Sequence, residues 1–138
     1  MFGKFSSQFG SGFSQGAAEA VTCHRFDAYL GCCAMCGAAA ESILLAVAIA
    51  QSGDEATTFA LYRVANGRRK VIDRVVGQAR PAIADPFRSA TGLLSFWRDD
   101  AAHGLASTIS EIVAHEALAR LMRFAEFAAE NWDDLTRQ

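Results

Sequence analysis

The chain has 138 residues, enough for one domain with a sizeable core, and 51% of them are hydrophobic. With only two prolines and many Ala, Leu, Glu and Arg residues, this composition favours a helical globule over a disordered chain. The net charge of −2 excludes a global electrostatic attraction to nucleic acid. The charge is unevenly spread, however. Residues 61–100 carry eight Arg or Lys against four Asp or Glu, so a partner with phosphates would meet this middle segment.

Residues 1–16 form an N-terminal arm rich in Phe, Gly and Ser, ahead of one helical domain over residues 17–138. Four phenylalanines of the arm repeat at the helical intervals of three and four: Phe2, Phe5, Phe9 and Phe13. The intervening Gly and Ser residues argue against a helix that is stable in isolation. We therefore expect either a frayed terminus or a segment that becomes ordered on a partner or on the protein's own core. No continuous apolar run follows Lys4, so a signal peptide is not expected.

Four cysteines lie within fourteen residues, at positions 23, 32, 33 and 36. A disulfide between Cys33 and Cys36 would join consecutive turns of one helix and constrain little, so we expect reduced thiols in a cytoplasmic protein. The cluster, with His24, can also be interpreted as a zinc site. Structural zinc ligands usually sit on turns and come with a second ligand pair, which is missing downstream. We therefore expect small core residues and neither a metal nor another cofactor.

Asp27 is a candidate N-cap for a long helix from about residue 28 to 51, which Ser52-Gly53 would close. This helix is apolar almost all round, so it belongs at the centre of a bundle or in a membrane. Glu41 near its middle argues against a membrane span. Its carboxylate either reaches water at the edge of the bundle or faces a polar cleft, where it would orient Arg98 or His103.

Asp54 or Thr57 can cap a third helix that runs to about residue 79, with Asn66-Gly67 as a kink or break. The densest basic run of the chain follows directly: Arg68, Arg69 and Lys70. Three charges in a row are most often a solvated helix face; the alternative is a contact with an RNA backbone.

Asp85-Pro86 predicts the start of the next helix, with Asp as the N-cap and Pro at the first position. Trp97 near its end is either a core residue or a platform for stacking a base. Thr108 and Glu111 match a capping box for a last helix from Ile109 to about Leu135. No strand pattern is present, so we expect an all-α bundle of four to five helices.

The stretch from Trp97 to Gly104 holds an Arg and a His five residues apart, with two acids directly after the Arg. Arg forks onto phosphate oxygens, and His exchanges protons near neutral pH. The segment Arg98-Asp99-Asp100-Ala101-Ala102-His103 resembles the signature of the HEPN superfamily, the higher eukaryotes and prokaryotes nucleotide-binding domains. That signature is an Arg and a His separated by four to six residues, the first of them polar. The segment from Cys36 to Leu45, around Glu41, resembles the second helix of HEPN-like domains.

The resemblance spans about residues 17–135 and implies a helical domain that dimerises around a shared cleft. Many HEPN proteins are metal-independent endoribonucleases of toxin–antitoxin, phage-defence and RNA-processing systems. Carried over, Arg98 would bind the scissile phosphate and His103 would act as general acid or base. Asp99 would orient one of that pair, and Asp100 would support the site. The family explains neither the Phe/Gly arm nor the cysteine cluster.

Two classes of function remain open at this point. The first is an RNA-cleaving enzyme of toxin or defence type, working as a homodimer, with an antitoxin or regulatory protein as a further expected partner. The second is a non-catalytic helical module that binds a nucleotide or a protein. The mild net charge favours the second, because an RNase that acts alone usually needs a basic surface. The local excess of four positive charges in residues 61–100 partly answers this objection.

Overall fold

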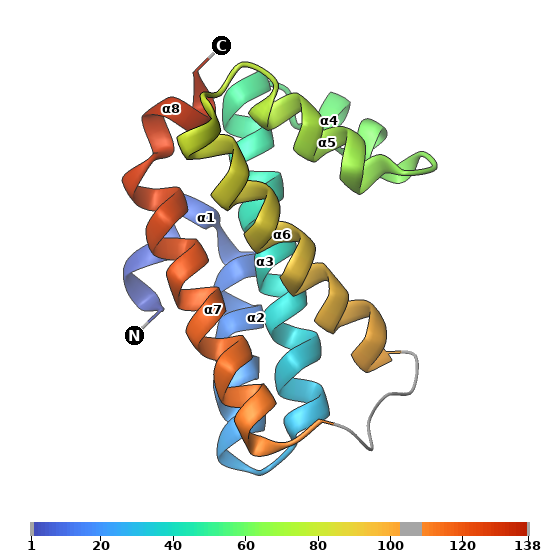
Figure 1. The fold of residues 1–138 in the computed structure, drawn as a ribbon, viewed down its shortest axis with the longest axis vertical. Coiled ribbons are helices and arrows are strands. Elements are labelled where there is room, and N and C mark those ends of the chain that lie inside the picture. Colours follow the sequence, from blue (N-terminus) through green and yellow to red (C-terminus); the bar gives the residue numbers. More distant parts are fainter. Residues whose placement is uncertain (1, 103–108, 138) are drawn as a thin grey trace.

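The computed structural model describes residues 2–102 and 109–137; for residues 93–102 only the backbone is described. This part of the chain is all-α and contains no strand, as the sequence predicted. Four long helices run side by side: α2 (Ser11–Arg25), α3 (Tyr29–Ser52), α6 (Pro81–Ala102) and α7 (Glu111–Glu130) (Figure 1). The shorter elements are a 3-10 turn (Gly3–Phe5), α1 (Ser6–Phe9), α4 (Glu55–Arg63), α5 (Gly67–Val76) and α8 (Trp132–Thr136).

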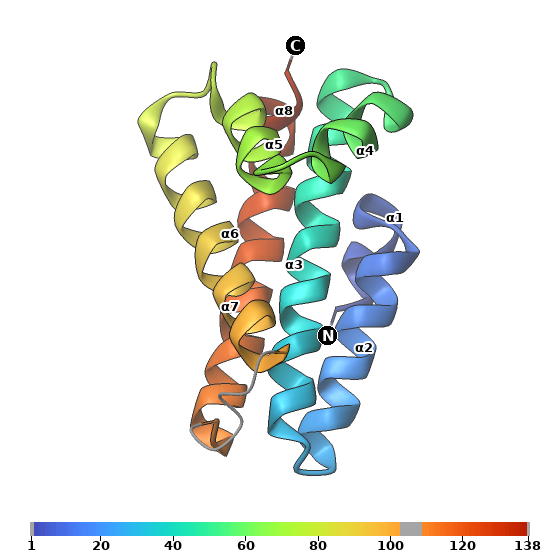
Figure 2. The same ribbon diagram turned by 90° about the vertical axis from the view of Figure 1, so that its right-hand side faces the viewer.

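Helix α3 is the centre of the bundle, with α2 on one side of it and α6 and α7 on the other (Figure 2). Helices α4, α5 and α8 lie at the end of the molecule where α3 ends (Figure 1). Among the described residues, α3 is the one helix long and apolar enough to cross a membrane. Its most apolar stretch is mostly buried against the neighbouring helices, as expected of a core helix.

Helices α2 and α3 pack closely because small residues face each other between them. A Cβ atom added to Gly16 would lie 3.3 Å from the Cβ atom and 3.3 Å from the backbone nitrogen of Ala39. One turn earlier on α2, a Cβ atom on Gly12 would lie 3.1 Å from the Ser42 hydroxyl. The glycines that weaken α2 as an isolated helix therefore permit its contact with α3.

The N-terminal arm belongs to the same core. Its four phenylalanines are all buried: Phe2, Phe5, Phe9 and Phe13. The Phe9 and Phe13 rings meet edge to face with centroids 5.3 Å apart, and Phe9 also lies 6.0 Å from the Trp132 ring of α8. Of the alternatives that the sequence left open, the structure shows an arm ordered on its own core, because the aromatic stripe has apolar partners there.

Two local signals in the first half of the chain act as predicted, and one does not. Gly53 ends α3 in the left-handed conformation with φ of 72°, and the Asp54 carboxylate caps α4 by accepting from the Thr57 amide at 3.0 Å. The Asp27 cap is wrong: Ala28 is the N-cap of α3, without a side-chain bond. Asp27 has φ of 61°, and its carboxylate accepts a hydrogen bond from the Tyr29 hydroxyl instead.

The predicted start of α6 at Asp85-Pro86 is also wrong, because the helix begins at Pro81 and continues through Pro86. Pro86 cannot donate the bond to residue 82, a loss that usually disfavours proline inside a helix. The earlier start lets Ile83 join Phe87 on the buried side of the helix, at 3% and 0% exposure. This burial offsets the missing hydrogen bond.

The last helix begins later and is broken, in contrast to the single helix predicted from Ile109 to Leu135. Ser110 caps α7 by accepting from the Val113 amide at 3.5 Å, while Thr108 of the predicted capping box lies outside the described residues. Asn131 separates α7 from α8 and donates its side-chain amide to the Phe127 carbonyl. The turn allows Leu135 to be fully buried.

The role of the arm is tested by Phe13→Ala. We expect the free energy of unfolding to fall by about 3–5 kcal/mol, because a fully buried ring leaves a cavity in the core. Phe26→Ala is the matched control, since Phe26 is 79% exposed and its loss should change stability by less than about 0.5 kcal/mol. Urea denaturation followed by circular dichroism measures both values. Equal stability of the two variants would contradict an ordered arm.

Candidate functional site

The stretch that the sequence singles out is located at the end of α6. Residues 97–100 lie in the last turns of this helix, which ends at Ala102, and His103 lies outside the described residues. On an α-helix, positions seven and eleven apart point within about 20° of each other. Position 98 is therefore on the same face of α6 as the buried Phe87 and Thr91. Position 97 is on the same face as Pro86 and Ala90.

The best-defined polar cluster of the described residues surrounds Glu41, halfway along the apolar α3. Glu41 as a whole residue is 9% exposed, and its Oε2 accepts a 2.5 Å hydrogen bond from the Tyr62 hydroxyl. The Arg68 guanidinium donates to Oε1 at 2.7 Å and forms an ion pair with it. Burial, followed by the bond to Glu41, raises the pKa of Tyr62. The Glu41 carboxylate, which is nearly removed from water, thus accepts one hydrogen bond from the neutral Tyr62 hydroxyl and one from the Arg68 cation.

Local backbone geometry brings Arg68 to this position. Helix α4 ends at Arg63, and Asn66 turns the chain with φ of 59° before α5 begins at Gly67. A Cβ atom on Gly67 would lie 2.0 Å from the Tyr62 carbonyl oxygen, so no larger residue fits there. The turn therefore folds α5 back on α4 and presents Tyr62 and Arg68 to the same carboxylate.

The position of Glu41 answers one question raised by the sequence. The carboxylate does not simply reach water at the edge of the bundle, because Tyr62 of α4 and Arg68 of α5 engage it. The expectation that it orients Arg98 or His103 stays a prediction, because those side chains lie outside the described residues. Tyr62 was missed by sequence reasoning. It lies 21 residues from Glu41, and no local pattern links the two.

The basic run after Asn66 is divided by the fold. Arg68 points into the bundle toward Glu41, with 31% of its side chain exposed, whereas Arg69 and Lys70 are exposed on α5. An RNA backbone would therefore meet Arg69 and Lys70. Arg68 instead holds α5 on α3.

The cysteines contribute to the core. Cys32, Cys33 and Cys36 are fully buried in α3, Cys23 is half-buried, and all four thiols are free. Burial raises the pKa of Cys33 to about 11, and a hydrogen bond to Cys32 together with burial raises that of Cys36. Among the described residues, no three His, Cys, Asp or Glu side chains are grouped so as to hold a metal ion.

A second feature that the sequence did not indicate is a pair of histidines between α2 and α7. The His24 and His115 rings lie 6.2 Å apart, centroid to centroid, in an apolar groove that also includes Val21, Leu118 and Met122. The two histidines are 91 positions apart in sequence, so only the packing of α7 beside α2 reveals the pair.

No family model, no curated protein and no solved structure matches this chain.

The Glu41 cluster is tested by a double-mutant cycle with Glu41→Gln and Arg68→Gln. Each single change should lower the free energy of unfolding by about 1–3 kcal/mol, because it leaves a mostly buried partner without its counter-charge. The double variant should lose less than the sum, since the two residues form one pair. Additive losses in urea denaturation would contradict the coupling. Arg69→Gln, next to Arg68 but exposed, serves as the control.

The buried thiols predict a specific dependence of stability on pH. The pKa of Cys33 is about 11 in the folded protein against 9.0 for an unperturbed thiol. The contribution of the neutral Cys33 thiol to the free energy of unfolding is therefore complete below pH 9. It is lost as the pH rises from 9 to 11, because only the unfolded chain then releases the proton. Cys33→Ala should reduce the loss of stability between pH 8 and pH 10 by about 1 kcal/mol. An unchanged pH dependence in denaturation experiments would refute this contribution.

Proposed function

We propose that this chain is a homodimeric, metal-independent endoribonuclease of toxin or defence type, with Arg98 and His103 as its essential pair. The observation that carries the proposal is the course of α6, which is helical through position 98 and is described as far as Ala102. Arg98 is thereby located in the last turns of the described helix. The end of α6 lies far from α4, α5 and α8, at the opposite part of the bundle (Figure 1).

The same geometry supports a dimer. Residues five apart on a helix point about 140° from each other, so Arg98 and His103 of one straight helix do not share a face. Position 98 lies within the regular part of α6, which the structure describes as far as Ala102. A second copy of the helix end supplies the missing partner for each residue. We therefore assign each site to Arg98 of one subunit and His103 of the other.

The residue types match the chemistry of RNA cleavage by an internal nucleophile. In-line attack of the ribose 2′-hydroxyl on the adjacent phosphate needs a proton acceptor and a cation at the phosphate. His103 takes the proton of the 2′-hydroxyl, and Arg98 binds the phosphate oxygens that gain charge. The bond to the 5′-oxygen then breaks, this oxygen takes up a proton from water, and a 2′,3′-cyclic phosphate is left on the other product. Asp99 orients the pair, and Asp100 supports the site.

A second candidate function is a helical module that binds another protein without catalysis. The specific observation in its favour is a set of large apolar side chains that remain in water, with Phe26 79% and Ile112 78% exposed. Exposed apolar residues of this size mark protein-binding surfaces when they are contiguous. The net charge of −2 also suits a protein partner.

The enzymatic proposal is tested on labelled total RNA with the wild type and the variants His103→Ala and Arg98→Lys. His103→Ala should lower the rate about 10²–10⁴-fold, because proton transfer is lost. Arg98→Lys should also fail, since a point charge does not replace the planar guanidinium fork. Products should end in a 2′,3′-cyclic phosphate, and EDTA should leave the rate unchanged.

Controls separate lost chemistry from lost structure. Position 98 is in register with buried positions of α6, so circular dichroism and the size of each variant must match the wild type before its rate is interpreted. Arg74→Gln, an exposed change on α5, should leave the rate unaltered. Cleavage that survives His103→Ala, or that EDTA abolishes, would rule out this mechanism. If no RNA is cleaved, the protein-binding module becomes the better-supported function.

A further inference from the structure

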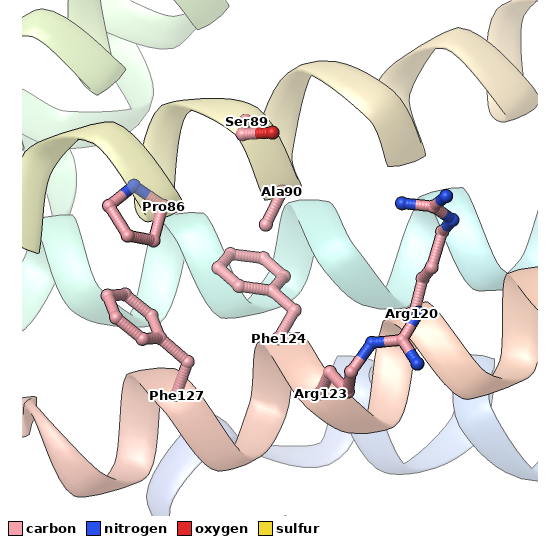
Figure 3. Close-up of a pocket in the computed structure, with 7 residues that line it drawn as sticks. All are labelled: Pro86, Ser89, Ala90, Arg120, Arg123, Phe124 and Phe127. Atoms are coloured by element: carbon pink, nitrogen blue, oxygen red, sulfur yellow. The ribbon is translucent and has the colours of Figure 1, made fainter.

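The surface between α6 and α7 contains a groove of about 200 Å³, and the described residues that line it include none of the expected site residues. Its walls come from both helices: Pro86 and Ala90 of α6, and Arg120, Arg123, Phe124 and Phe127 of α7 (Figure 3). The aromatic rings lie toward one end and the two arginines toward the other. The groove is therefore divided into an apolar half and a cationic half.

The apolar half is held rigid by the core. Phe124 is 2% exposed, and its ring packs edge to face on Phe87 with centroids 5.5 Å apart. Phe127 is only half-buried, and its ring lies opposite the exposed Pro86 across the groove (Figure 3). Aromatic and proline rings facing each other offer two flat apolar surfaces to a planar ligand.

The cationic half presents guanidinium groups from successive turns of α7. Arg120 reaches across toward α6, and Glu116 fixes it by accepting bonds of 2.9 and 2.7 Å from its Nε and Nη2 (Figure 3). Arg123 is exposed and forms no ion pair with any residue that the structure describes. None of the described residues that line the groove is acidic. Because Arg120 is engaged by Glu116, the exposed Arg123 is the cation with which this end attracts an anion.

We infer that this groove binds a nucleoside monophosphate unit, with the base between Phe127 and Pro86 and the phosphate on Arg123. The groove is smaller than the about 300–1,000 Å³ of sites that enclose a drug-sized ligand, so it holds one ring system and leaves the sugar at its mouth. Stacking on an aromatic ring tolerates any base, and the arginine fork recognises phosphate.

The inference rests on the proposed function where the nucleotide is part of RNA. Ala90 and position 98 are eight residues apart on α6, a distance of about 12 Å along the helix. An RNA strand with one base in the groove would thus pass close to Arg98, while the groove itself stays separate from the cleavage site. The groove would act as a binding subsite beside the cleaved bond, and Arg123 and Phe127 would select single-stranded RNA, because a paired base is not available for stacking.

The test measures binding by calorimetry, without any cleavage, using adenosine 5′-monophosphate, adenosine and inorganic phosphate as separate probes. The monophosphate should bind more tightly than either of the other two. Arg123→Gln should weaken its binding about tenfold, as expected for the loss of a charge-assisted contact. Phe127→Leu should weaken the binding of the monophosphate and of adenosine alike, whereas Arg74→Gln should leave the affinity for both unchanged. Added salt should weaken the binding of the monophosphate but not the binding of adenosine.

Each outcome is informative. Equal binding of the monophosphate by the wild type and Arg123→Gln, or no binding by the wild type, would overturn the inference. Arg123 is exposed, so its variant should fold, and circular dichroism checks this. Binding without RNA cleavage by the wild type would keep the groove as a nucleotide site and refute the proposed enzyme. RNA cleavage without binding of the monophosphate would refute the nucleotide site in the groove and leave the proposed enzymatic function standing.

Discussion

A single carboxylate on the central apolar helix determines how the small helices meet the bundle. Glu41 lies halfway along α3, 9% exposed, in a helix that otherwise buries Cys, Ala, Ile, Leu and Val side chains. An ionised group in such a place is costly unless it is hydrogen-bonded and paired. Tyr62 and Arg68 supply both interactions. Because these residues come from α4 and α5, compensation of the charge ties that pair of helices to the long bundle.

Other contacts extend this connection at the same end of the molecule. The Gln51 side chain, near the end of α3, donates to the Val75 carbonyl of α5 at 2.9 Å and to the Leu135 carbonyl of α8 at 3.2 Å. The Ser52 and Thr58 hydroxyls are 3.1 Å apart and join α3 to α4. This end is thus fixed by polar contacts, whereas the rest of the bundle depends on apolar packing. Position 98 of α6 lies away from that polar end.

Much of the fold was predictable because it depends on local rules. The all-round apolar pattern of residues 28–51 indicated a central helix, and Gly53 and Asp54 marked its end and the next start. The errors occur where tertiary contacts outweigh local preference. Pro86 is a strong start signal, yet burial of Ile83 extends α6 to Pro81.

The candidate site was predictable only in part, for a similar reason. Glu41 is visible in the sequence as a charge in an apolar run, and Arg68 as part of a basic run. That the two form a pair depends on the turn at Asn66-Gly67 and on the way α5 packs on α3. Tyr62, and the groove with Phe127, carry no sequence pattern at all. Contacts between distant segments arise from packing, which periodicity does not encode.

The central claim is that Arg98 of one subunit and His103 of another act on the same phosphate. The most direct measurement is the RNA-cleaving activity of heterodimers purified through two different tags, one subunit carrying Arg98→Lys and the other His103→Ala. Such a heterodimer has one site with both changes and one site with neither. It should therefore recover about half of the wild-type activity, although both parent homodimers are inactive. A heterodimer as inactive as its parents, or a protein that remains monomeric, would contradict the claim.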